Sequence, residues 1–153
     1  MSDTPLLRWK PVAIGLAVVV VLAGGLAFLI VETIPVRGAL ATYTELIATA
    51  NRPDLTDVER VATARRLCSE RYLRTHELAV APEGGLIGIP RNIHKNFQAW
   101  RREGRIWVCP TNRVGPLYQF VHESGRWRFD GPVGLLRPRG EIVPYEEPPQ
   151  GER

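Results

Sequence analysis

The hydrophobic and polar positions divide this chain into stretches with different patterns. The first stretch is an unbroken apolar run from Val12 to Val31, twenty residues without a charged or strongly polar side chain. As an α-helix with a rise of about 1.5 Å per residue, the run would be about 30 Å long, which matches the hydrocarbon thickness of a bilayer. Lipid offers no partner to a free backbone N–H or C=O, so a segment inside it has to be helical. The pattern predicts one transmembrane helix over residues 11–34.

The charges beside this run predict its orientation. Arg8 and Lys10 precede the run and outnumber Asp3, and positive residues are enriched on the cytoplasmic side of membrane helices. Residues 1–10 are therefore expected to form a cytoplasmic tail, with the following domain extracytoplasmic, in the periplasm. A cleaved signal peptide is the alternative, because Ala39-Leu40-Ala41 resembles a cleavage site. The run is longer than the ~7 to 15 apolar residues of a secretory signal, which favours an uncleaved anchor.

Small residues recur inside the apolar run at a spacing of four. They allow another helix to approach closely, although they are also common in anchors that have no partner helix. The candidate helix-packing face consists of Ala13, Ala17, Ala23, Gly24 and Ala27.

After the anchor, apolar residues recur at helical spacing. Ile34-Pro35 predicts an interruption, because proline lacks an N–H and disfavours helix in the residue before it. A new helix is expected from about Gly38. Its apolar face consists of Leu40, Tyr43, Leu46, Ile47 and Ala50.

Two further helices are predicted before the strands begin. Asp54 or Thr56 is expected to cap a second helix of about 20 residues, and Glu59, three residues after Thr56, completes a capping-box pattern. Short extended pieces are expected at His76–Ala81 and at 86–89. The segment Asn92–Arg102 carries apolar residues at spacings of four and three, which predicts a third, short helix.

The last third of the chain carries the strand signal. Aromatic and branched residues dominate Arg105–Cys109, Leu117–Glu123 and Arg126–Asp130, and Ser124-Gly125 is typical of a tight hairpin turn. The expected fold class is α+β: one transmembrane helix, then a small domain over residues 37–137 with two to three helices packed on a mainly antiparallel sheet. Residues 138–153 are rich in proline and glutamate and predict a disordered or peripheral tail.

Helices first, a short third helix and then antiparallel strands ending in the hairpin F-V-H-E-S-G-R-W-R-F-D-G resemble the nuclear transport factor 2-like superfamily, a cone-shaped α+β fold. Trp127 and Phe129 stand where its last hairpin commonly has Trp-x-Phe. The resemblance covers about residues 38–136 and implies a membrane-anchored member. That superfamily includes enzymes, ligand binders and assembly modules, so the resemblance decides little about function. No arrangement here maps onto the carboxylate and tyrosine of its steroid-isomerase-like members, which disfavours an enzyme.

Charge and cysteine content narrow the picture further. Between Arg37 and Pro144 there are 17 Lys and Arg residues against 11 Asp and Glu, and Lys95 is the only lysine. Arginine suits bidentate pairing with carboxylates or phosphates and stacking on aromatic rings. Cys68 and Cys109 match no metal-binding spacing, which leaves one disulfide or two buried thiols as alternatives.

One cluster of basic and aromatic residues is the candidate interaction surface. It consists of Trp100, Arg101, Arg102, Arg105 and Arg113, with Trp107 nearby. Anionic lipid headgroups or an acidic protein surface would suit it, and no nucleic acid is expected with the domain outside the cytoplasm. A solvated face is the alternative.

No set of residues predicts catalysis, a metal or a cofactor. His94 and His122 are expected on exposed positions, and His76 beside Glu77 lacks further ligands at useful spacing. The sequence therefore favours a non-enzymatic, single-pass membrane protein whose domain is an accessory or scaffold subunit of a larger membrane or envelope complex. Its expected partners are membrane lipid and the proteins of that complex. A membrane-tethered enzyme or small-ligand binder that uses the interior of the cone is the alternative.

Overall fold

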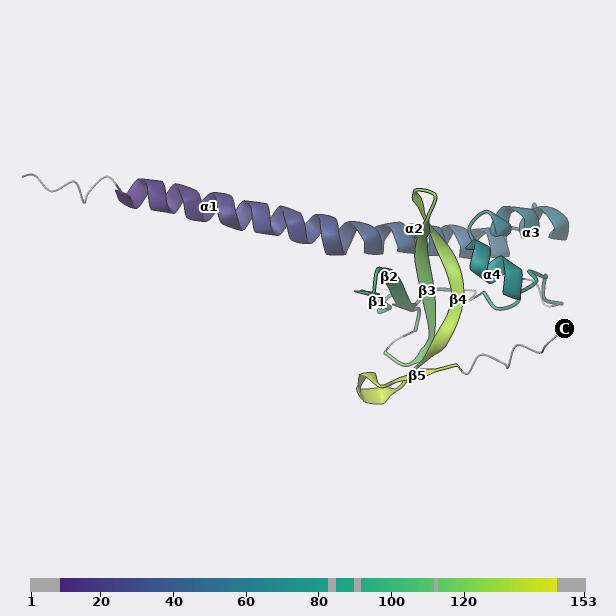
Figure 1. Ribbon diagram of the computed structural model, residues 1–153. Coiled ribbons are helices and arrows are strands. Elements are labelled where there is room, and N and C mark those ends of the chain that lie inside the picture. The colour runs from purple at the N-terminus through teal and green to yellow at the C-terminus, as the bar shows by residue number, and fades with distance from the viewer. Residues whose placement is uncertain (1–8, 83–84, 90–91, 112, 146–153) are drawn as a thin grey trace, which may run out of the picture. The chain divides into compact units, whose positions relative to one another are not determined.

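The protein has an α+β fold, as the sequence predicts (Figure 1). The computed structural model describes residues 9–82, 85–89, 92–111 and 113–145, with side chains from residue 13 onward. The chain divides into two compact units, Met1–Ile34 and Pro35–Arg153.

The first unit contains the apolar helix. Helix α1 (Trp9–Phe28) is followed by a π-helical turn, η2 (Leu29–Thr33). Between Ile14 and Val31 the large apolar side chains are 46–72 % exposed, whereas water-soluble proteins bury such residues. By its length and composition, one helix of the described chain is apolar enough to cross a membrane.

The predicted interruption at Ile34-Pro35 is wrong. Helix α2 (Ile34–Asn51) begins directly after η2, and Pro35 is its second residue. Pro35 lies within one continuous helical stretch, Ala13–Asn51, and its ring lacks the N–H that would bond to the preceding turn. The N–H of Ile34 bonds to the carbonyl of Leu29, five residues earlier, so the wider π-turn absorbs the irregularity.

The capping box at Thr56 is present, but the helix that it begins is shorter than expected. Glu59 donates its backbone N–H to the Thr56 hydroxyl, and its carboxylate accepts from the Thr56 N–H. Helix α3 spans only Asp57–Arg65, and a separate helix, α4 (Glu70–Thr75), follows. Strand pairing interrupts the helix, since Ser69 donates its N–H to the carbonyl of Phe129 at 2.8 Å.

Five antiparallel strands form one sheet in the order β1-β2-β3-β4-β5 (Figure 1). Ser124 and Gly125 form the expected tight turn between β3 and β4, both with positive φ. The strand bounds are β1 Gln98–Arg102, β2 Arg105–Cys109, β3 Gly115–Glu123, β4 Arg126–Leu136 and β5 Ile142–Pro144.

One prediction for this region is wrong. The expected helix over Asn92–Arg102 is instead an irregular segment followed by strand β1, because Glu103 and Gly104 form a tight turn that returns the chain as β2. In the segment predicted as a disordered or peripheral tail, a short 3-10 helix, η3 (Pro138–Gly140), leads into β5, which pairs with β4 at the edge of the sheet. The extended piece at 76–81 forms only a single bridge, between Val80 and Leu86.

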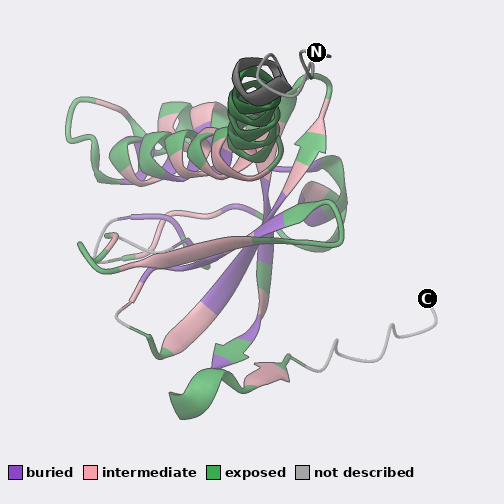
Figure 2. Cartoon of the chain, turned by 90° about the vertical axis from the view of Figure 1, so that its left-hand side faces the viewer, coloured by how far each residue is buried: buried purple, intermediate pink, exposed green. Residues whose placement is uncertain are grey.

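The main core lies between the helices and one face of the sheet, and Figure 2 shows buried residues along the central strands and the inner helix faces. Helix α2 contributes Ala39, Tyr43, Leu46 and Ala50 at spacings of four, three and four, so the predicted apolar face is confirmed. The core also contains Tyr72, Ile106, Val108, Tyr118, Phe120 and Phe129.

Burial raises the pKa of several groups in this core. The pKa of Tyr43 is raised well above its usual value, and the pKa values of Tyr72, Tyr118 and Cys68 are raised to about 12, each mainly through desolvation. Each group then holds its proton more tightly in the folded chain than in the unfolded one. Its contribution to stability is complete below the unfolded pKa and is lost as the pH rises through the folded pKa.

We expect the substitution Tyr43→Phe to stabilise the protein by about 1 kcal/mol, since the Tyr43 hydroxyl is buried without a hydrogen-bond partner in the described chain. Above about pH 10 the difference between variant and parent should widen, because only the parent has to ionise this phenol on unfolding. Urea unfolding of the full chain in detergent, followed by tryptophan fluorescence, measures both effects. Tyr145→Phe, at a side chain that is 44 % exposed, should change neither.

Candidate functional site

The face of the sheet opposite the helix-side core carries most of the predicted interaction surface. Successive side chains in a strand alternate between faces, and on this face a second apolar cluster forms around Cys109, Leu117 and Leu136, with Trp100 and Trp107 packed against it. Polar and aromatic side chains continue this face toward β1. We call this set the Trp-Arg face: Trp100, Arg102, Arg105, Trp107 and Gln119.

Two tryptophans form the apolar part of the Trp-Arg face. Trp100 and Trp107 are direct cross-strand partners, and their ring centroids are 6.5 Å apart with a tilt of 49°. The guanidinium carbon of Arg102 lies 4.8 Å from the Trp107 ring centroid, within cation–π range. The indole N–H of Trp107 is buried without a hydrogen-bond partner in the described chain. The rings are half-buried and packed, so they present a prearranged aromatic surface.

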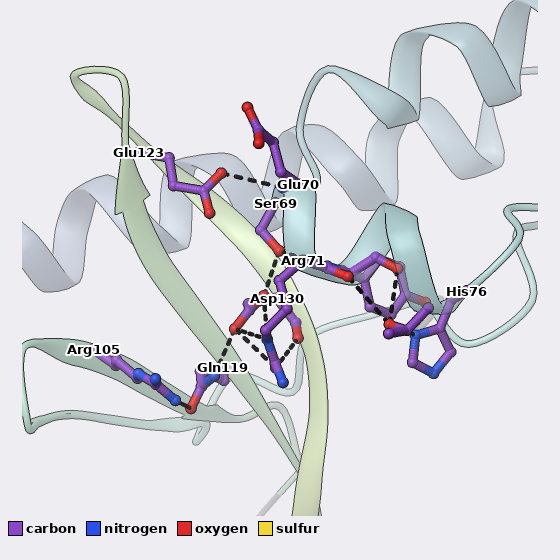
Figure 3. A network of polar contacts seen from close by, with 10 residues as sticks. Ser69, Glu70, Arg71, His76, Arg105, Gln119, Glu123 and Asp130 are labelled. Carbon is purple, nitrogen blue, oxygen red and sulfur yellow. Dashed lines mark hydrogen bonds and ion pairs between the residues drawn. The ribbon is translucent and has the colours of Figure 1, made fainter. Parts of the chain in front are cut away.

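Arg105 is held in place by a chain of polar contacts that ends at a buried carboxylate (Figure 3). Arg105 donates to Gln119 Oε1 at 3.0 Å, and the amide nitrogen of Gln119 donates to Asp130 Oδ2 at 2.7 Å. Asp130 also accepts a hydrogen bond from the Ser69 hydroxyl and pairs with Arg71, whose Nε lies 3.1 Å from both carboxylate oxygens. Three side chains, from β3, α4 and the residue that caps α4, therefore converge on Asp130 of β4, and Arg105 of β2 is joined to them through Gln119.

This network is better suited to positioning than to catalysis. The Asp130 side chain is only 2 % exposed, and three neighbouring side chains donate hydrogen bonds to it. Arg71 is half-exposed and also donates to the Asp130 backbone carbonyl at 3.1 Å, which ties α4 to β4. What reaches the surface is the guanidinium of Arg105 and part of Arg71, both cationic.

The structure separates two of the predicted residues from this surface. Arg101 pairs in register with Ile106, whose side chain belongs to the helix-side core, so alternation points Arg101 to the other face. Arg113 lies in the connection between β2 and β3, exposed and with a φ of 67°. Trp100, Arg102 and Arg105 are brought together as expected.

The polar network is not visible from the sequence. Ser69 and Arg71 lie about 50 to 60 positions before Gln119 and Asp130 in the chain. A glutamine between Tyr118 and Phe120 was the one available signal.

The two cysteines are free thiols, which decides between the alternatives that the sequence left open. Cys68 belongs to the helix-side core, whereas Cys109 belongs to the cluster on the opposite face, where its sulfur lies 3.3 Å from the Thr111 hydroxyl. Burial raises the pKa of the Cys68 thiol to about 12, so it is a poor nucleophile near neutral pH.

The remaining candidates lie apart from the Trp-Arg face. His76 stacks on Tyr72 with ring centroids 4.6 Å apart, and His122 lies beside Trp127 at 5.3 Å. The described residues contain no group of three or more metal-binding side chains. The small residues of the anchor remain a predicted packing face, and a side chain added at Gly24 would meet no atom within 4 Å.

Comparison with models of protein families, with curated proteins and with solved structures found no match for this chain.

The polar network gives a direct test of which arginine stabilises the fold. Arg71 and Arg74 both lie in α4, but Arg74 pairs only with Glu70 at the surface, where both side chains are more than three-quarters exposed. We expect Arg71→Ala to destabilise the protein by about 2 kcal/mol, because it strips a buried carboxylate of its ion pair, and the half-exposed position of Arg71 limits the loss. Arg74→Ala should cost less than about 0.5 kcal/mol.

Urea unfolding of the two full-length variants in the same detergent measures both losses. The two changes remove the same side chain from the same helix, so propensity effects cancel. Equal losses of stability in the two variants would show that the contacts of Arg71 with Asp130 stabilise the fold no more than a surface ion pair does.

Proposed function

We propose that this protein is a single-pass membrane protein whose soluble domain serves, without catalysis, as an accessory or scaffold subunit of a larger membrane complex. The proposed orientation places residues 1–10 in the cytoplasm and the domain in the periplasm, in keeping with Arg8 and Lys10 before the apolar run. The observation that carries the proposal is the Trp-Arg face, a prearranged binding surface on a domain joined to an exposed apolar helix.

The residue types on this face favour a protein partner. Tryptophan and arginine are enriched among the side chains that contribute most to binding at protein interfaces. Trp107 is packed beneath Arg102, and Arg105 is fixed through Gln119, so little side-chain freedom remains to be lost on binding. The guanidinium groups favour an acidic partner surface, with which they can form bidentate pairs.

The interior of the domain supports an interaction role over a ligand-binding one. The space between the helices and the sheet is filled by the rings of Tyr43, Tyr118, Phe120 and Phe129, with neighbouring centroids 5.7–6.2 Å apart. Membership of the nuclear transport factor 2-like superfamily is part of the same proposal, and the order of helices before antiparallel strands supports it.

Attachment and sidedness can be tested with single cysteines in intact cells. Cysteine in place of Ser124, at the exposed tip of the β3-β4 hairpin, should react with a membrane-impermeant maleimide before lysis, whereas Ser2→Cys should react only after lysis. The native thiols are buried and give little background. The reverse pattern would invert the orientation, and release of the intact chain by alkaline carbonate would exclude the anchor.

The partner surface can be tested by charge reversal. We expect Arg102→Glu to reduce the stoichiometric protein that co-purifies with the tagged full chain in mild detergent by at least about tenfold, since a cationic hot spot becomes repulsive. Arg126→Glu, the same change at an exposed position in the β3-β4 hairpin, is the matched control. A monodisperse chain without a stoichiometric partner, or equal loss in both variants, would contradict the proposal.

A further inference from the structure

Helix α3 borders a shallow groove that the proposed function does not use. One open depression of about 460 Å³ is lined by Val58, Val61, Ala62 and Val80, with Asp57 and Arg65 beside them. A second depression, of about 420 Å³, shares Val61 and Arg65 with the first and continues along the segment from Leu73 to Leu78. Together they form one groove, which we call the α3 groove.

Part of the apolar lining of the α3 groove is exposed: Val58 and Ala62 are exposed, whereas Val61 and Val80 are half-buried against the core. Val58 is 79 % exposed, more than any other large apolar side chain recorded in the Pro35–Arg153 unit. Val58, Val61, Ala62 and Arg65 follow at spacings of three, one and three, so they form one stripe on α3. Val61 is half-buried and packs on the core beside the buried Ala64, so the exposed part of the stripe consists of Val58, Ala62 and Arg65. An apolar stripe beside a depression on a small domain is typical of a surface that another protein covers.

The charges along this stripe are self-complementary. Asp57 stands at the start of α3 and Arg65 at its end, about 12 Å apart along the helix axis. The guanidinium of Arg65 has no ion pair or side-chain hydrogen bond in the described chain. Asp57 contacts Arg60 at 3.0 Å, but its side chain is 72 % exposed and can accept a second donor. A helix with this pattern that packs antiparallel to a copy of itself meets opposite charges at both ends.

We propose that the α3 groove is covered by a second copy of this chain, with the two α3 helices packed antiparallel around a two-fold axis near Val61. Each Asp57 then pairs with the Arg65 of the other copy, and the exposed Val58 and Ala62 of the two copies meet in the seam between the helices. Such an interface is isologous, since the same patch serves both subunits. This dimer goes beyond the proposed function, because it uses neither the Trp-Arg face nor an acidic partner.

The two copies need only a modest contact area if both are anchored in one membrane. Tethering raises the effective concentration of one domain around another, so an interface too small for a stable dimer in solution can be occupied. The raised effective concentration rests on the proposed membrane attachment. The charge complementarity of two α3 helices does not depend on that attachment.

Disulfide crosslinking of the full chain in native membranes tests the dimer. Ala62→Cys places a thiol near the proposed axis, and Ala48→Cys places one at an exposed position of α2 as the matched control. Under a mild oxidant, Ala62→Cys should give a disulfide-linked dimer several-fold more efficiently than Ala48→Cys. Equal crosslinking of both variants, or crosslinking of the Ala62→Cys variant to a different protein, would overturn the proposal.

Charge exchange separates the specific pairing from a general effect on α3. In the Ala62→Cys background, Asp57→Arg and Arg65→Asp should each lower the yield of dimer, and the two changes together should restore it, because each pair is re-formed with its signs exchanged. A double variant no better than the single ones would overturn the pairing. Loss of dimer with unchanged co-purification of the partner would leave the proposed function intact, so the two proposals fail separately.

Discussion

The buried carboxylate of Asp130 is the interaction on which the arrangement of this domain depends. A charge removed from water is costly unless opposite charge and hydrogen-bond donors surround it, and here those donors come from three directions. Ser69 and Arg71 approach from α4 and its cap, and Gln119 approaches from β3. These donors can reach Asp130 together only when α4 lies against the sheet and β3 and β4 are in register. One carboxylate therefore couples the position of a six-residue helix, too short to be stable alone, to the strand pairing.

The two faces of the sheet carry different kinds of side chain. On the helix side, aromatic side chains of α2, α4 and the central strands pack edge to face. On the other face the apolar cluster around Leu117 is small and is bordered by tryptophan, glutamine and arginine side chains. Tryptophan suits this boundary because it combines a large apolar ring with a polar N–H. A surface with these properties is stable in water, and covering it with a binding partner is still favourable in free energy.

Local signals predicted much of this fold, and long-range contacts decided the rest. The capping box at Thr56, the apolar spacing in α2 and the Ser124-Gly125 turn each depend on residues within a few positions, and each is present. The apolar spacing in residues 92–102 fits a helix, but the end of this region forms strand β1. Pairing of Trp100 with Trp107 across the Glu103-Gly104 turn favours the strand. The second helix ended early because residues 67–69 pair with Phe129, about 60 positions later.

The candidate site shows the same limit. The cluster of Trp100, Arg102 and Arg105 was visible because it is compact in sequence, but alternation along β1 removes Arg101 from it. The contact between Ser69 and Asp130 spans 61 positions, and the residues next to either one in the sequence do not predict it.

The two proposed binding surfaces, the Trp-Arg face and the α3 groove, are both small. A tryptophan pair with two arginines, or nine residues of helix, would bind weakly between molecules that diffuse freely in solution, because association costs several kcal/mol of lost rigid-body freedom. Attachment to one membrane removes much of that cost in advance, since anchored partners already share a plane. Under the proposed attachment, the apolar segment therefore contributes to recognition as well as to location. It allows a domain of about a hundred residues to devote most of its interior to aromatic packing and still bind partners through modest patches.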